Sequence, residues 1–439
     1  MFPLHERTRR FICRTLFLLC GVLPTATVLA WCIRVNSAAQ ATAVRAQLES
    51  ALGLKVQLSA VAFPRPGCTL LHGVELLDPD SGETIAAARL VELNENASGI
   101  ILATLSQPEL QLSHAAALKA LVDRRLHGWA SDIRLVGSEL TLHWPGGDQT
   151  LVDCGAFFEN SSDAQRTSFV FRLPNTPDAD ASRQIVQFQR HSVTAAPDAR
   201  AAAGVNDGGN NCDIVIQSLP YPVVCATLGL ENHLGSDCLC SAKIRACETP
   251  DGWQAEVTAG GLQNIDLHRL VSEQFPHQMS GVAEATINHA LFHAGRLEEA
   301  TGSIHAGPGV VSGSLLRSAA EFLRMRAGGT IRDDELLPYA ECSAAFVLDT
   351  KGLAIHGHCQ QSEPGAVIRA GNAMLLAESG GAPVPVVALI KMLVPDSRVQ
   401  VPATRQTDWL QRMLPVPDVV PGDPQSPPQA RLRGGRDLH

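Results

Sequence analysis

The chain has 439 residues, enough for two or three domains that each bury a hydrophobic core. Only 18% of its residues are Asp, Glu, Lys or Arg, against about 25% in an ordinary soluble domain, and 5% are aromatic. The net charge of −9 argues against a nucleic-acid partner, because phosphate binding requires clustered Lys and Arg and single-stranded bases stack on aromatic rings.

An uncharged stretch at residues 15–33 is the first predicted element. Its 19 residues, at about 1.5 Å each in a helix, span the hydrocarbon core of a bilayer. Pro24 lies in its middle, where membrane helices tolerate proline better than soluble helices do. Arginines precede the stretch, so the positive-inside rule predicts a cytoplasmic N-terminus. Residues 1–34 are therefore expected to form a cytoplasmic tip and a single transmembrane anchor, with the body of the chain exported.

A cleaved signal peptide is the alternative interpretation of the same stretch. Residues 28–30 (VLA) and 39–41 (AQA) both have the small-residue pattern that a signal peptidase accepts. The anchor is favoured because the apolar stretch is longer than the usual signal-peptide core of about 7–15 residues. Both interpretations export the body.

The exported body begins with a predicted helix at residues 35–52, which Gly53 can end. Runs with alternating apolar residues, separated by Pro- and Gly-containing turns, then predict strands. In the run 69–77, for example, every second residue is placed on one face, as a half-buried strand requires. The predicted strands of this first β-rich region, residues 35–193, lie at 56–60, 69–77, 84–93, around 110–112, at 133–135 and at 140–144, with a helix at 115–129.

Residues 194–211 have almost nothing to bury and predict a linker or long loop. A second β-rich region follows at 212–414, with hairpin-like runs and one clear helix at 315–326. Residues 415–439 contain six prolines and predict a disordered tail. The expected fold class is therefore mainly β or α+β, with many short strands and a few short helices.

Four features of the chain together resemble the AsmA-like family, relatives of TamB. The first is a basic tip and an anchor followed by a helix that ends near residue 53. The second is the strand series at 70–93, which is joined by an Asp/Gly turn. The others are the segments 260–287 with 295–307, and 309–323 leading through 344–359 to a strand near residue 370.

The resemblance implies a non-enzymatic protein, anchored in the inner membrane through residues 15–33, whose body lies in the periplasm. It implies an elongated, curved, groove-like antiparallel sheet that supports outer-membrane biogenesis and binds or conducts phospholipid, or contacts other envelope proteins. An apolar concave face would suit acyl chains, since each buried methylene contributes about 0.8 kcal/mol. An ordinary packed core gives the same residue pattern, and the chain is shorter than the family pattern, too short to cross a whole periplasm alone.

Twelve cysteines are present, nine of them beyond the anchor. In an oxidising compartment some of these nine could pair. The densest group is Cys238, Cys240 and Cys247, whose spacing is not a standard zinc spacing. Buried or disulfide-bonded cysteines are the favoured interpretation.

Three further motifs contain residues that could bind a metal or act in catalysis. His356 and His358, next to Cys359, share a strand face, but no third or fourth metal ligand lies nearby in the sequence. Residues 309–314 approach a Gly-x-Ser-x-Gly nucleophile motif with the wrong spacing, and the acidic run 333–335 is typical of a solvated loop. No catalytic, cofactor-binding or metal-binding residue is therefore predicted, and no cofactor.

Two other functions stay open from the sequence. One is a structural scaffold that binds partner proteins through exposed strand edges. The other is an anchored hydrolase, which needs a nucleophile and a base brought together from distant parts of the chain.

Overall fold

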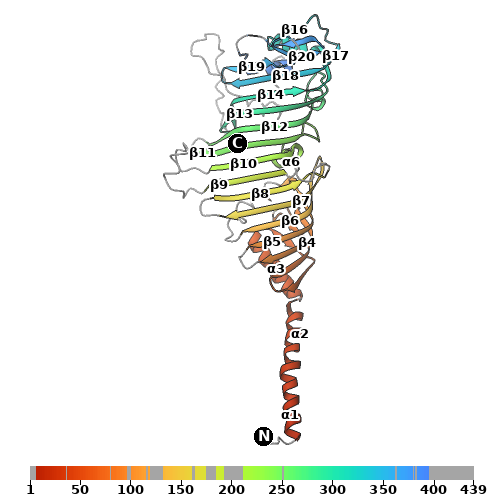
Figure 1. Cartoon of the computed structure of the whole chain (residues 1–439), viewed down its shortest axis with the longest axis vertical. Coiled ribbons are helices and arrows are strands. Elements are labelled where there is room, and N and C mark those ends of the chain that lie inside the picture. Colours follow the sequence, from red (N-terminus) through yellow and green to blue (C-terminus); the bar gives the residue numbers. More distant parts are fainter. Residues whose placement is uncertain are drawn as a thin grey trace, which may run out of the picture.

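The computed structural model of the chain describes residues 6–35, 37–79, 81–95, 100–114, 117–118, 132–160, 164–174, 184–191, 211–249, 252–360, 363–378, 380 and 383–394. These residues form a long ladder of strands with a helical rod extending from one end (Figure 1). The end next to the rod is called proximal here, and the opposite end distal. The linker predicted at 194–211 and the tail predicted at 415–439 lie outside the described residues, apart from Asn211, and so does most of the helix predicted at 115–129.

The rod consists of three consecutive helical segments, α1 (Glu6–Phe17), the π-helical turn η1 (Leu18–Val22) and α2 (Leu23–Val35). The Leu23 N–H donates to the Leu18 carbonyl five residues earlier, which is the bonding pattern of a π-turn. Pro24 follows directly and has no N–H to donate, so the regular helical bonding is broken at this place. The single uninterrupted helix expected at 15–33 is therefore divided. In the described part of the chain, no helix combines the length and the apolar character that crossing a membrane requires.

The helix α3 (Ala38–Leu52) comes next and confirms the predicted element at 35–52. It ends at Gly53, which has φ 69° and whose N–H donates to the Glu49 carbonyl. Glycine adopts this left-handed conformation without the steric cost that a Cβ atom brings, which explains why the helix stops here.

One sheet of 19 strands makes up the body, and it confirms the prediction of a mainly β fold with few helices. From β3 to β14 every strand pairs with the next one in the chain, and all these pairs are antiparallel except β5–β6. The strands of this ladder are β3 (Cys68–Leu77), β4 (Thr84–Glu95), β5 (Ile101–Gln111), β6 (Ile133–Trp144), β7 (Gly147–Asn160), β8 (Ala164–Arg172), β9 (Gln184–His191), β10 (Asn211–Pro220), β11 (Leu239–Thr249), β12 (Gly252–Asp266), β13 (Val282–His293) and β14 (Arg296–Ala306).

Both ends of the ladder are more complex than its middle. At the proximal end two short strands, β1 (Lys55–Gln57) and β2 (Ala60–Arg65), both pair with β3. At the distal end β14 pairs with β18, which in turn pairs with both β19 and β20. The distal strands are β16 (Arg326–Ala327), β18 (Glu341–Asp349), β19 (Gly352–Gly357), β20 (Ala366–Ala370) and β21 (Ala373–Ala377), and a separate two-stranded sheet is formed by β15 (Gly309–Ser312) and β17 (Leu336–Tyr339).

Three further helices pack on the sheet: α6 (Tyr221–Leu228), α7 (Gly313–Phe322) and α8 (Val386–Leu393). The helix predicted at 315–326 is α7, which begins two residues earlier because the Ser312 side chain caps it by accepting from the Leu315 N–H.

Two details of the sheet differ from the predictions. The pair β5–β6 is parallel, because the connection between Gln111 and Ile133 is long enough to return the chain to the starting end of β5. The runs predicted at 133–135 and 140–144 are one strand, β6. The strands β9 and β10, on either side of residues 192–210, also pair with each other, so the sheet continues past this segment.

Several strands contain a non-glycine residue with a left-handed backbone: Gln107 in β5, Asp153 in β7, Ser218 in β10 and Asn264 in β12. The pairing register shifts at the last three of these positions, as a β-bulge requires. A bulge inserts one residue, so side chains three positions apart then point to the same face.

We expect Gln107→Gly to stabilise the protein, because Gln107 has φ 49° and a non-glycine residue in this conformation costs about 1–2 kcal/mol. Thr104→Gly in the same strand is the control and should destabilise by about 0.5–1 kcal/mol, since glycine weakens a regular strand. Thermal unfolding of the full chain in detergent measures both effects. A lower apparent Tm for Gln107→Gly would contradict the left-handed backbone at this position.

Candidate functional site

The main candidate site is one face of the sheet, which is defined here by two rows of directly paired residues and is called the apolar face. Each row crosses twelve strands, from β5 to β14 and on to β18 and β19. Row one is Ile101, Ile133, Phe158, Thr167, Phe188, Ile214, Ile244, Val257, Ala290, Ala300, Leu348 and Leu353. Row two is Ala103, Leu135, Ala156, Phe169, Val186, Ile216, Ala242, Gly260, Ile287, Gly302, Phe346 and Ile355.

Directly paired residues of neighbouring strands point to the same side of a sheet, so each row is a continuous line of side chains. Thr167 is the single polar residue in the two rows. The apolar face therefore extends without a charged residue from β5 to β19.

The opposite face carries paired charges, together with exposed apolar side chains such as Leu102, Val136 and Val347. On β10 and β11, Arg245 Nε lies 3.5 Å from Asp213 Oδ1, and on β12 and β13, His289 Nδ1 lies 3.7 Å from Glu256 Oε1. Water can solvate these charges, so this face can be exposed to solvent, whereas the apolar face is more stable when it is covered.

The apolar face is covered at both ends. At the proximal end, Val44 and Leu48 of α3 pack against Leu71 and Val91. At the distal end, the buried side chains of α7, such as Leu316 at 0% exposure, belong to the largest hydrophobic cluster of the protein.

The middle of the face is different. α6 covers a part of it, where Val223 packs with Leu142 and Phe171. Phe188, Ile214, Ile216 and Ile244 are only half-buried, and within the described part of the chain they belong to none of the buried clusters. Large apolar side chains thus remain partly open to solvent over β9, β10 and β11.

The edge strands β1 and β19 are partly blocked by bonds to flanking residues. At β1 the Val56 N–H donates to Glu49 Oε1 of α3 over 3.2 Å. This hydrogen bond, followed by that from Arg45, lowers the pKa of Glu49. At β19 Leu353 exchanges two backbone hydrogen bonds with Val384, and the Gly357 N–H donates to Glu378 Oε2. Unpaired edge groups, which would bind another strand, are therefore used up at these positions.

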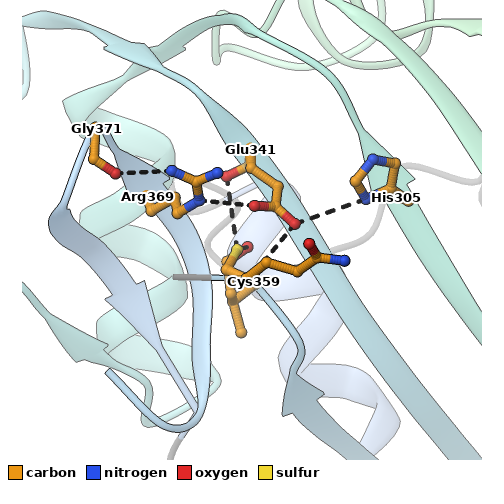
Figure 2. Close-up of polar contacts among 7 residues, drawn as sticks. His305, Glu341, Cys359, Arg369 and Gly371 are labelled. Atoms are coloured by element: carbon orange, nitrogen blue, oxygen red, sulfur yellow. Dashed lines mark hydrogen bonds and ion pairs between the residues drawn. The ribbon is translucent and has the colours of Figure 1, made fainter. Parts of the chain in front are cut away.

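A nearly buried ion pair lies at the distal end (Figure 2). Glu341 is 7% exposed, and its Oε2 accepts from Arg369 Nε at 2.6 Å. Its Oε1 accepts from the Gln360 N–H at 3.3 Å and lies 4.0 Å from His305 Nδ1. Burial alone raises the pKa of Glu341, but the hydrogen bonds from Arg369 and Gln360 and the nearby positive charges outweigh burial, so its pKa lies below the usual value. The pair joins β18 to β20 and is a structural contact.

The structure also brings together a serine and a histidine that are far apart in the sequence. His277, 2% exposed, has Nδ1 3.0 Å from Ser314 Oγ and Nε2 2.9 Å from the Met392 carbonyl oxygen. Ser314 lies in turn 3.0 Å from Ser312 Oγ, within the 309–314 motif. With Nε2 donating to a carbonyl and Nδ1 accepting from Ser314, both ring nitrogens are used. The His277 ring therefore connects the start of α7 to the end of α8 through hydrogen bonds. No sequence motif predicts this contact.

The histidines and the acidic run that the sequence singles out do not form a common site among the described residues. His356 Nδ1 lies 3.5 Å from Glu378, and the described residues contain no group of three or more side chains that could hold a metal ion. In the acidic run, Asp333 pairs with Arg317 at 2.6 Å and Asp334 with Arg332 at 3.0 Å, as in a solvated loop.

All the described cysteines are free thiols in this structure. Of the densest group, Cys238 is fully buried, while Cys240 and Cys247 are half-buried. Burial, followed by the neighbouring Cys240 and Cys225, raises the pKa of Cys238 to about 11. A reactive thiol has a lowered pKa, so Cys238 is an inert side chain.

Comparison of the chain with protein-family models, with curated proteins and with solved structures finds no match.

Glu341→Gln should make stability less dependent on acid pH. Because the folded-state pKa of Glu341 is lowered, its ionised form stabilises the fold above the unfolded-state pKa of about 4.5, and this contribution is lost as pH falls through the folded-state value. The variant should lose about 2 kcal/mol at neutral pH, and the difference from the wild type should shrink below about pH 4. Thermal unfolding between pH 7 and 3 measures this, with the exposed Glu335→Gln as the control. A difference that stays constant with pH would contradict the ion pair.

His277→Ala should destabilise the protein by about 2–4 kcal/mol, since it removes one hydrogen bond from Ser314 and one from the Met392 carbonyl and opens a cavity. His268→Ala, at a side chain that is 61% exposed, is the control and should change stability by less than about 0.5 kcal/mol. Thermal unfolding compares the two variants, and equal effects would show that the buried contact does not stabilise the fold.

Proposed function

We propose that this protein is a non-enzymatic membrane-anchored protein of AsmA-like type, whose body lies in the periplasm and binds the acyl chains of phospholipid in support of envelope biogenesis. The observation that carries the proposal is the apolar face, which continues over twelve strands and is half-open in its middle.

The half-open segment can accommodate part of a hydrocarbon chain. The strands β9 to β11 lie next to one another, and neighbouring strands are about 4.8 Å apart, so these three strands extend over roughly 10 Å. Laid across the strands, an acyl chain would contact row one at Phe188, Ile214 and Ile244, with each buried methylene contributing about 0.8 kcal/mol.

A concave face would serve this purpose better than a flat one, because it surrounds the chain on three sides. The bulges at Asp153, Ser218 and Asn264 support such a curved groove, since a bulge bends its strand and increases the local twist. Both ends of the face are covered, by α3 and by α7 with α8. The acyl chain would therefore enter from the side of the sheet. With this route of entry, the protein itself need not be long enough to cross the periplasm.

The anchor is the second part of the proposal. Along the rod, Leu16, Phe17 and Leu23 are exposed at 62%, 69% and 63%. Such a surface is unfavourable in water, since leaving each large apolar side chain exposed costs about 1.5–3 kcal/mol. Insertion of residues 15–33 into the inner membrane removes this cost and leaves the preceding arginines in the cytoplasm.

The scaffold alternative is less well supported. It requires open strand edges, and the edges at β1 and β19 are bonded to Glu49, Val384 and Glu378. A hydrolase would require a base that a substrate can reach, whereas His277, which contacts Ser314, is only 2% exposed.

Site-specific photo-crosslinking tests the proposal. A benzophenone amino acid replaces Ile214 or its neighbour Val215, which points to the opposite face of β10, and the full chain is placed in vesicles of phosphatidylethanolamine and phosphatidylglycerol. Irradiation should add a phospholipid mass at position 214 and little at position 215. The same probe at Leu18 in the rod is a positive control for the anchor.

Crosslinks at Leu18 but equal or absent crosslinks at 214 and 215 would reject lipid binding and retain the anchor. No crosslink at Leu18 would reject the anchor.

A further inference from the structure

The distal end of the sheet contains a fork at which β18 changes its partner. Over residues 344–349 β18 pairs with β19, and at Glu341 and Cys342 it pairs with β20. The β19 register continues one step past Ala344, because the His358 N–H donates to the Ser343 carbonyl at 3.0 Å. Continued by one more step, this register would set Cys359 opposite Cys342, a position at which β18 instead pairs with Ile368 of β20.

Contacts of Cys359 support this neighbourhood. Its Sγ lies 3.7 Å from the Glu341 carbonyl oxygen, which belongs to the peptide group that joins Glu341 to Cys342. Its N–H donates to the Ala366 carbonyl of β20 at 3.0 Å. Cys359 therefore lies in the fork between β18 and β20, next to the Glu341–Arg369 pair (Figure 2).

The separation is suitable for a covalent bond. Beyond a hydrogen-bonded pair, the next position of an antiparallel ladder has Cα atoms about 4.5 Å apart and side chains on the same face. A disulfide accommodates Cα separations of about 4.4–6.8 Å, which allows for the displacement that β20 imposes. Both thiols are half-buried. Burial, followed by the nearby Cys359, raises the pKa of Cys342 to about 12, as expected if the two sulfurs are neighbours.

We propose that Cys342 and Cys359 form a disulfide that closes the fork at the distal end of the sheet. Each thiol gives up its proton in turn. The Cys359 thiolate attacks the disulfide of an oxidant, either a dithiol oxidase or oxidised glutathione, and releases one thiol. The Cys342 thiolate then attacks the Cys359 sulfur of this mixed disulfide and releases the second thiol. Two electrons thus pass from the cysteine pair to the oxidant, whose disulfide becomes two thiols.

The bond would have a defined structural effect. It would close the loop that contains the β18–β19 hairpin, and the closed loop would restrict the unfolded chain. It would also hold β20 against β18 where Glu341 meets Arg369. The bond is therefore expected to stabilise the folded distal end.

Other cysteines provide a built-in comparison. Cys225, Cys238 and Cys240 form a second group near the start of α6, where the Tyr221 N–H donates to the Cys238 carbonyl at 2.8 Å. None of this group continues a strand register that sets it opposite another cysteine. Cys240 is half-buried in a strand, like Cys342, and serves as the control position.

The experiment uses the full chain in detergent, incubated with oxidised glutathione, and so supplies its own oxidant. The proposal rests on the proposed function only for the compartment that provides an oxidant in the cell. Remaining thiols are alkylated, and the digested protein is searched for a peptide pair that is joined through Cys342 and Cys359. The wild type and Cys240→Ser should give this pair, and Cys342→Ser and Cys359→Ser should not. Reduction should lower the apparent Tm of the first two proteins by roughly 5 °C or more and leave the other two unchanged.

Complete alkylation of Cys342 and Cys359 after oxidation, or their linkage to other cysteines, would overturn the proposal. So would a Tm decrease on reduction that is equal in all four proteins. None of these outcomes bears on lipid binding, which the crosslinks at positions 214 and 215 test separately.

Discussion

The structure depends on one constraint, which is that the cross-strand register keeps apolar side chains in the same rows over twelve strands. In a strand, successive side chains alternate between the two faces, so a shift of one residue moves every following side chain to the wrong side. Where the spacing of apolar residues changes from two to three positions, a bulge keeps the following side chains on the correct face. Leu151 and Cys154 lie three positions apart, on either side of Asp153, and still belong to one buried cluster. Leu262 and Ile265, on either side of Asn264, likewise contribute to one cluster, in which Leu262 is partly buried.

A sheet that consists of a single layer must satisfy its edges and its exposed faces by other means than a second sheet. Side chains from flanking elements bond the edges, with Glu49 at β1 and Glu378 at β19. Helices cover the two ends of the apolar face, and the opposite face carries charges. Only the middle of the apolar face lacks a cover among the described residues, and its half-buried Ile214 and Ile244 are the place where a ligand would gain most from contact.

The sequence predicts the local elements well where a local signal exists. The alternation at 69–77 corresponds to β3, and Gly53 ends α3 as expected. The sequence does not predict the π-turn beside Pro24, because it does not show how the backbone hydrogen bonds rearrange around a missing N–H.

Contacts between distant residues could not be predicted. His277 meets Ser314 and Met392, and Glu341 meets Arg369, but none of these pairs has a periodic or motif-like spacing. The apolar face is predictable only in part. The sequence of each strand shows the alternation of apolar residues, but only the register between strands shows that these residues form continuous rows.

The arrangement of the proximal end limits how the proposed function can operate. α2 ends at Val35 and α3 begins at Ala38, so the helix that covers the first part of the apolar face follows directly from the rod. Val44 and Leu48 then hold α3 on the sheet. If the rod lies in the bilayer, the strands are stacked away from the membrane and the half-open segment at β9 to β11 begins several strands beyond the membrane surface (Figure 1). A lipid therefore cannot slide straight from the bilayer along the face, because α3 lies in its way, and it must pass around α3 or be delivered to the side of the sheet.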